Sequence, residues 1–208
     1  MAAVYDAILG RRSIRRFQDR PVSDDVVETL LEAGRNAPSR GNSQPWRFVV
    51  VKNKDEIEAL AHASYKQEVV AKAGACIIIL GVIDPRPTVR ARFKELVDAG
   101  VFDQETADTG EAHLSDWGWN ELRADAALNS SIPATIMCLA ALDFGLGSCW
   151  VKLLHDDQVL SIIGADPNYY YNAGILAFGY PDQDPKARPR LPLSEIVYLD
   201  KVDQPYFP

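Results

Sequence analysis

The sequence predicts an α+β fold built as one domain. Amphipathic segments with helical spacing lie between short apolar segments that suit strands, and proline- and glycine-containing stretches separate them. A chain of 208 residues is long enough for one domain, which would bury about 70% of its unfolded surface. No internal repeat or low-complexity tract divides the chain, so residues 1–208 are expected to form a single unit.

The predicted helices carry apolar residues three and four positions apart. The clearest one follows Ser23, a good N-cap, and buries a face that contains Val27 and Leu30. Further helices are predicted over residues 4–10, 55–63, 67–73, 120–142 and 156–163. Within the longest of these, Pro133 lacks a backbone donor, which predicts a kink there or a helix that begins near Ile132.

The predicted strands are short. They cover residues 47–52, 76–80, 148–151 and 173–178. The second is apolar on both faces, which is typical of a strand in the middle of a sheet. The proline-rich segment 182–208 cannot fold on itself and is expected to be an extended arm, with a possible strand over residues 192–198.

Composition argues against several kinds of partner. The net charge of −7 disfavours nucleic acid or an anionic membrane, yet five arginines fall between residues 11 and 20, an excess that suits one small anion. The longest apolar run, residues 75–83, is too short to span a bilayer. Cys76, Cys138 and Cys149 form no Cys-x-x-Cys pair, which predicts buried free thiols in a cytoplasmic protein.

Metal, nucleophile and dinucleotide sites are not indicated. His62, His113 and His155 are isolated from one another, which disfavours a metal site. The sequence has no Gly-x-Ser-x-Gly elbow, and no Gly-x-Gly-x-x-Gly follows a strand. No metal and no Rossmann site are therefore expected.

Residues 37–48 form a polar loop between a predicted helix and a predicted strand. Two prolines, a glycine, two serines, an asparagine and a glutamine disfavour regular structure, and Pro38 ends the preceding helix. Trp46 adds a large, flat apolar surface to these hydrogen-bonding groups. The loop therefore suits a planar ring rich in heteroatoms, or it is an ordinary connector.

Guanidinium groups gather near both ends of the chain. A guanidinium binds phosphate bidentately and stays charged, and three or four charge-assisted bonds could hold a monophosphate firmly. The candidate phosphate ligands are Arg11, Arg12, Ser13, Arg15, Arg188 and Arg190. The alternative is a solvated basic face with no ligand.

Three stretches of the sequence resemble the nitroreductase family, the FMN-dependent NAD(P)H oxidoreductases. They are residues 11–17 (Arg-Arg-Ser-Ile-Arg-Arg-Phe), the loop residues Pro38-Ser39, Asn42 and Gln44-Pro45-Trp46, and residues 188–193 (Arg-Pro-Arg-Leu-Pro-Leu). Their order and spacing extend the resemblance over nearly the whole chain. Residues 86–122 are the part that it does not cover.

The resemblance implies a nitroreductase-like fold, in which helices flank a central, mostly antiparallel sheet. It also implies a homodimer that holds FMN at its interface. The 182–208 arm of one subunit would wrap around the other and add a strand to its sheet.

Cofactor-binding residues follow from the same resemblance. Arg11, Arg12, Ser13, Arg15, Arg188 and Arg190 would hold FMN by its phosphate, with Arg15 also near the pyrimidine end of the ring. Pro38, Ser39 and Asn42 would approach the flavin from the neighbouring subunit, Gln67 would bond the ring edge, and Gly147 and Ser148 would line the opposite face. Arg40 replaces the small residue common in the family, which leaves the contacts of that part of the loop open.

Residues 86–122 are expected to form a helical flap over the site. Their charged composition, interrupted by glycines, carries several aromatic side chains. The candidate substrate-binding residues are Arg40, Phe93, Phe102, Trp117 and Trp119. Alternatively, the aromatic residues only anchor a surface excursion.

The activity that the resemblance implies needs no catalytic side chain, because the flavin carries the redox chemistry at N5. NAD(P)H would give up a hydride and leave before a nitroaromatic or a quinone enters, in a ping-pong order. Rival interpretations are dehalogenation or ring oxidation on the same fold, a flavin-binding module without turnover, and a basic patch for nucleic acid, which the net charge disfavours.

Overall fold

A single antiparallel sheet lies at the centre of the computed structural model, which describes residues 4–207. Strands β1 (Trp46–Val51), β2 (Ala75–Val82), β4 (Tyr170–Gly179) and β3 (Gly147–Val151) lie side by side in that order, and each neighbouring pair is antiparallel. The predicted α+β fold with an antiparallel sheet is confirmed.

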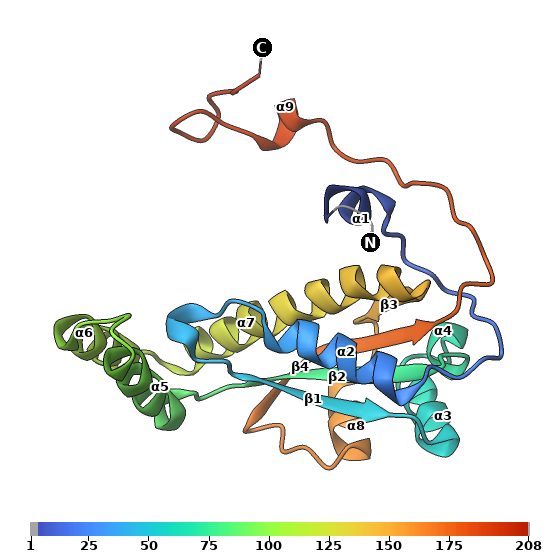
Figure 1. The fold of residues 1–208 in the computed structure, drawn as a ribbon, viewed down its shortest axis with the longest axis horizontal. Coiled ribbons are helices and arrows are strands. Elements are labelled where there is room, and N and C mark those ends of the chain that lie inside the picture. The colour runs from blue at the N-terminus through green and yellow to red at the C-terminus, as the bar shows by residue number, and fades with distance from the viewer. Residues whose placement is uncertain (1–3, 208) are drawn as a thin grey trace.

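The helices fall into groups around the sheet (Figure 1). Helices α2 and α7 cover one face, α3, α4 and α8 cover the other, and α5 and α6 form a hairpin at one end. Their bounds are α1 (Val4–Gly10), α2 (Asp24–Arg35), α3 (Lys54–Ala63), α4 (Glu68–Ala71), α5 (Arg86–Asp98), α6 (Gln104–Ser115), α7 (Trp119–Ala140), α8 (Asp156–Ile162) and α9 (Leu193–Ile196), with short 3-10 turns η1 (Arg40–Asn42) and η2 (Ala141–Phe144). The helices predicted from apolar spacing are all present, with ends that differ by a few residues.

Strand β2 joins the two cores of the protein. Ile77 and Ile79 pack in the cluster formed with α2 and α7, while Cys76 and Ile78 pack in the cluster formed with α3, α4 and α8. Successive side chains of a strand point to opposite faces, so a strand covered on both faces must be apolar throughout. This confirms the prediction of a central strand over residues 76–80.

Helix α7 runs through Pro133 without interruption. The predicted helix start near Ile132 is therefore wrong, because α7 begins at Trp119. Contacts with α2, β2 and β4 along α7 outweigh the local preference of the proline. Residues Trp119–Phe144 are long and apolar enough to cross a membrane by length and composition, with a mean hydropathy of 1.3, but α7 is the core helix on one face of the sheet.

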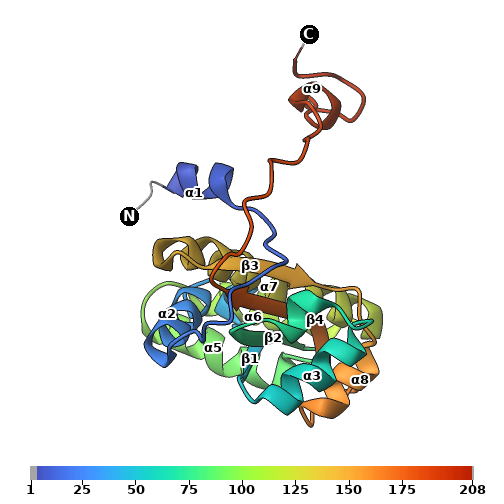
Figure 2. The ribbon, with the colours of Figure 1, turned by 90° about the vertical axis from the view of Figure 1, so that its right-hand side faces the viewer.

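The chain leaves the sheet after β4 as an extended arm, and α1 projects on the same side of the molecule (Figure 2). No residue of the arm from 182 to 207 is buried, and α1 contains no buried residue either. The possible strand over residues 192–198 is instead mostly the short helix α9, and among residues 4–207 only Tyr198 of that stretch pairs, in an antiparallel bridge with Pro205 of the same arm.

Cys76 offers a test of the buried core. It is fully buried in β2, and burial raises the pKa of its thiol to about 12. Because the thiolate is the reactive form, Cys76 is expected to react with an aromatic disulfide at pH 8 about a thousandfold more slowly in the folded protein than in denaturant. Peptide mapping by mass spectrometry would follow Cys76 separately from the other thiols. Rapid labelling of Cys76 in the native protein would contradict the buried position.

Candidate functional site

A small cavity brings the two ends of the chain together. It has a volume of about 70 Å³ and lies where the segment after α1 meets the segment after β4. Its lining residues are Arg11, Arg12, Ser13, Arg15, Pro185, Lys186, Arg188 and Arg190. All six residues singled out as phosphate ligands thus share one cavity.

Backbone contacts hold the arginine-rich segment of residues 11–17 against β3. The N–H of Ile14 donates to the carbonyl oxygen of Ser148 at 2.9 Å, and Ser13 forms a parallel bridge with Ser148. Gly147 allows this approach, since a Cβ there would lie 2.5 Å from Cγ1 of Ile14. Gly147 and Ser148 are themselves buried, and their backbone fixes where the cavity arginines lie.

The cavity is strongly positive. Within residues 4–207, none of its five arginines forms an ion pair with a carboxylate. Their positive charge also affects Cys149 of β3. Burial raises the pKa of the Cys149 thiol, and the nearby Arg15, Arg11 and Arg188 partly oppose that rise. Unneutralised guanidinium groups around one small cavity suit an anion with several oxygens.

The loop between α2 and β1 has an unusual backbone. Gly41, Asn42 and Gln44 have φ values of 54°, 51° and 46°, in the left-handed region that favours glycine. The N–H of Gln44 donates to the Oγ of Ser39 at 3.0 Å, which closes the turn. Pro38 and Asn42 are exposed, so both are free to contact another molecule.

Arg40 is tied to α7. Its Nε donates to Oδ1 of Asp125 at 3.0 Å and its Nη2 donates to Oδ2 at 3.1 Å, while its backbone N–H donates to Oδ1 of Asn129 at 3.0 Å. The guanidinium also lies over the ring of Trp117, 4.7 Å from the ring centroid. One edge of the Arg40 guanidinium is therefore bonded to Asp125 and one face is covered by Trp117, a placement that argues for an anchoring role.

The loop and the arginine cavity lie at different positions along α7. Arg40 contacts α7 at Asp125 and Asn129. Arg11 instead lies near Cys138: burial raises the pKa of the Cys138 thiol, and a hydrogen bond with Ser148 and the charge of Arg11 partly oppose that rise. From Asn129 to Cys138 the helix axis rises about 14 Å. Figure 1 shows the loop toward the hairpin end of α7 and α1 near its other end. Within one chain, the loop and the arginine cavity are therefore separated along α7.

Gln67 stands at the turn before α4. Its Nε2 donates to the carbonyl oxygens of Leu153 at 2.8 Å and Ser64 at 2.9 Å, which joins this turn to the segment after β3. Its side-chain oxygen has no protein donor among the hydrogen bonds of the described residues. That oxygen remains available to accept a hydrogen bond from a ligand.

The four aromatic residues of the flap differ in exposure. Phe93 is 3% exposed and contacts Phe102 edge-on at 5.8 Å between ring centroids, in a cluster that also includes Trp117. Trp119 is 49% exposed at the start of α7. Phe93, Phe102 and Trp117 thus hold the hairpin together, as the anchoring alternative describes, and Trp119 is the one of the four that offers most of its ring to a ligand.

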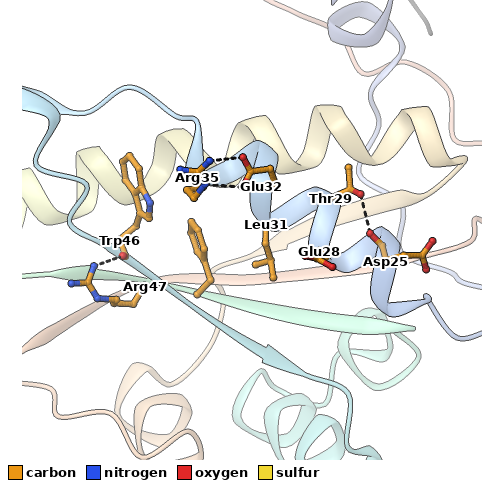
Figure 3. Close-up of a pocket in the computed structure, with 9 residues that line it drawn as sticks. Asp25, Glu28, Thr29, Leu31, Glu32, Arg35, Trp46 and Arg47 are labelled. Carbon is orange, nitrogen blue, oxygen red and sulfur yellow. Dashed lines mark hydrogen bonds and ion pairs between the residues drawn. The ribbon is translucent and has the colours of Figure 1, made fainter. Parts of the chain in front are cut away.

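A larger cavity of about 810 Å³ lies between α2 and β1 (Figure 3). Its lining residues are Asp25, Glu28, Thr29, Leu31, Glu32, Arg35, Trp46, Arg47 and Phe48. The apolar patterns of the sequence predicted helix α2 and strand β1, but not the position of β1 at the edge of the sheet. The groove between them was therefore not predicted. Asp125 and Asn129 were likewise missed, because nothing local in a long apolar helix marks them as partners of the loop.

Comparison with known proteins assigns the chain to a family. The sequence model of the Nitroreductase family matches residues 8–180. The chain belongs to the nitroreductase family. A Thermus thermophilus protein named NADH dehydrogenase is 30% identical over 194 residues, which cover 92% of this chain and 93% of the relative. The NADPH-flavin oxidoreductase of Vibrio harveyi is 29% identical over 210 residues, which cover 98% of this chain and 76% of that protein.

Solved structures share the fold of this nitroreductase-family chain. A protein from Exiguobacterium sibiricum, solved in complex with FMN, has a TM-score of 0.84 at 23% identity, over 96% of this chain and 98% of that one. The NADPH:FMN oxidoreductase of Vibrio harveyi, solved with NAD+, has a TM-score of 0.75 at 25% identity, over 97% of this chain and 78% of that one. The nitroreductase-like fold expected from the sequence is confirmed.

Proposed function

We propose that this nitroreductase-family protein is a homodimeric, cytoplasmic FMN-dependent oxidoreductase that passes a hydride from NAD(P)H to a small aromatic acceptor, a nitroaromatic or a quinone. Family membership and the flavin oxidoreductases among its relatives support the reaction class and both cofactors. The kind of acceptor and the ping-pong order, in which NAD(P)H leaves before the acceptor enters, are parts of the proposal. The three free, buried cysteines fit a reducing compartment.

The arginine cavity is the observation that carries the proposal. FMN ends in a phosphate dianion, and the cavity offers five guanidinium groups, the Lys186 ammonium and the Ser13 hydroxyl with no competing carboxylate in an ion pair among residues 4–207. This donor set fits a phosphate by its charge and by the bidentate donors that guanidinium groups offer. A cavity of about 70 Å³ leaves room for the phosphate but not for the ring, so residues outside the cavity would hold the ring.

The chain supplies binding and polarity rather than a proton carrier. Bound FMN supplies hydride-transfer chemistry at N5. The side-chain oxygen of Gln67 would accept a hydrogen bond from the ring edge, and the charge of Arg15 near the pyrimidine end would favour an electron-rich ring. Pro38, Ser39 and Asn42 of the other subunit would cover the ring, and Trp119 would line the entrance for the nicotinamide and the acceptor.

Exposed apolar surface supports the homodimer. In α1, Tyr5 is 69% exposed and Ile8 is 53% exposed, although a helix in a monomer normally buries one face. Strand β1 pairs only with β2 within the described residues, so its outer edge is open to another strand. We propose that the 182–208 arm of a second copy enters the groove between α2 and β1 and adds a strand there.

The first test is the colour of the protein. Purified protein is expected to be yellow, to release FMN on denaturation, and to bleach when NADH or NADPH is added without air. Colourless protein that fails to take up added FMN would remove the proposal. Yellow protein that neither nicotinamide reduces would identify a flavin-binding module in its place.

A second experiment addresses the acceptor. Protein reduced anaerobically should regain its flavin absorbance on addition of a nitroaromatic or a quinone, and initial rates at varied NAD(P)H and acceptor should give parallel double-reciprocal lines. Intersecting lines would exclude the ping-pong order while leaving the oxidoreductase class intact.

A further inference from the structure

The loop Ser39–Gln44 interlocks with the α5–α6 hairpin. Gly41 lies against Phe93 so closely that a Cβ on Gly41 would clash with Cε1 of the ring. Phe93 in turn packs against Gly110 of α6, where a Cβ would come within 2.6 Å of the same ring. The hairpin and the loop therefore share one tightly filled contact and cannot shift independently without losing it.

Arg40 fixes this contact to the core helix. One edge of its guanidinium forms two parallel bonds with Asp125, whose side chain is only 5% exposed, and one face lies over Trp117 at the end of the hairpin. One side chain thus connects the loop, α7 and the hairpin. Two parallel bonds to one carboxylate define the orientation of the guanidinium as well as its position.

The loop needs such a constraint. Asn42 and Gln44 adopt positive φ values without being glycine, and left-handed geometry at such residues persists only where the surrounding contacts determine it. A buried ion pair is weak support for stability in itself, since desolvation offsets most of the attraction. The geometry of the Arg40–Asp125 pair is therefore better explained by the conformation that it imposes on the loop.

We propose that Arg40 is a positioning residue, which holds the Ser39–Gln44 loop in the conformation with Gly41, Asn42 and Gln44 left-handed and couples it to the α5–α6 hairpin. The inference rests on the proposed function, in which this loop covers the flavin ring of the neighbouring subunit. It replaces direct substrate binding as the role of Arg40. The loop that covers the ring and the α5–α6 hairpin packed against it are then expected to move away from α7 together.

Arg40→Lys is the main test, because lysine keeps the charge opposite Asp125 but cannot form two parallel bonds or lie flat on Trp117. In the FMN-free protein, amide hydrogen exchange of residues 39–44 and of the hairpin is expected to accelerate together. The Kd for FMN, measured by quenching of flavin fluorescence, is expected to rise about tenfold, and the visible flavin spectrum should shift. The melting temperature of the FMN-free protein should change little.

Arg90→Lys is the matched control, since Arg90 forms an ion pair with Glu111 on the exposed surface of the same hairpin. It should leave exchange in the loop and the Kd for FMN at the wild-type values. Unchanged exchange and unchanged FMN affinity in Arg40→Lys would overturn the inference.

A double variant separates positioning from filling of space. Arg40→Met with Asp125→Leu replaces the pair by apolar side chains of similar size, which is expected to preserve the melting temperature but not the slow exchange of the loop or the FMN affinity. Wild-type exchange and affinity in this variant would show that the pair only fills space and would overturn the inference. If the wild-type protein binds no FMN, the proposed function fails, while the exchange measurements still decide the role of Arg40.

Discussion

Replacing Arg11 and Arg190 together by alanine is expected to remove nearly all FMN from the purified protein while leaving it folded. The two side chains reach the same cavity from opposite ends of the chain. Each charge-assisted hydrogen bond to phosphate contributes about 1.5–3 kcal/mol, so the loss of two corresponds to about a hundredfold to ten-thousandfold in Kd. Neither side chain is buried, so folding should be little affected. Titration of the FMN-free variant with FMN, followed by fluorescence, measures the effect.

Arg20→Ala is the matched control for this variant. Arg20 belongs to the same arginine-rich segment but lies over the ring of Tyr180, 3.6 Å from its centroid, and does not line the cavity. It should retain FMN at the wild-type affinity. Equal losses in the control and in the double variant would mean that general charge, and not the cavity, attracts the cofactor.

The second large effect is expected from a chain that ends after Arg190. This truncation keeps every residue of the arginine cavity but removes the exposed remainder of the arm. Without that arm the groove of about 810 Å³ between α2 and β1 would remain open to water on both subunits. Sedimentation should give the mass of a single chain, and FMN should bind at least about a hundredfold more weakly because contacts from the second subunit are lost.

A point variant tests the same contact from the groove side. Phe48→Asp places a charge in the groove, and Val101→Asp, at a position that is 65% exposed between α5 and α6, serves as the matched control. Only Phe48→Asp should weaken dimerisation. A truncated chain that stays dimeric and retains FMN would exclude the proposed role of the arm.

Local patterns in the sequence were sufficient for most of the fold. The spacing of Val27 and Leu30 predicted the buried face of α2, and the continuous apolar run of β2 predicted a strand covered on both faces, because burial imposes these periodicities directly. The convergence of the two arginine groups needed the family resemblance, since charge alone equally suits a solvated face.

Features that depend on distant partners were not predictable. Arg40 and Asp125 are 85 positions apart, and neither neighbourhood indicates the other. Phe93 lies in a charged segment that was expected to form a helical flap over the site, yet its ring faces the interior of the hairpin, which a weakly periodic segment does not reveal. The strand expected over residues 192–198 is replaced by α9 for a related reason: within residues 4–207 only Tyr198 of that stretch pairs, with Pro205 of the same arm, so a full strand there requires a partner from a second copy.

The separation of the arginine cavity from the Ser39–Gln44 loop along α7 links cofactor retention to the number of molecules present. If each flavin is bound by one chain and covered by the other, the fraction of protein that retains flavin depends, by the law of mass action, on the fraction that is dimeric. Dilution that separates the chains would then release the cofactor without any chemical change. Loading with flavin would, by the same thermodynamic linkage, hold the two chains together.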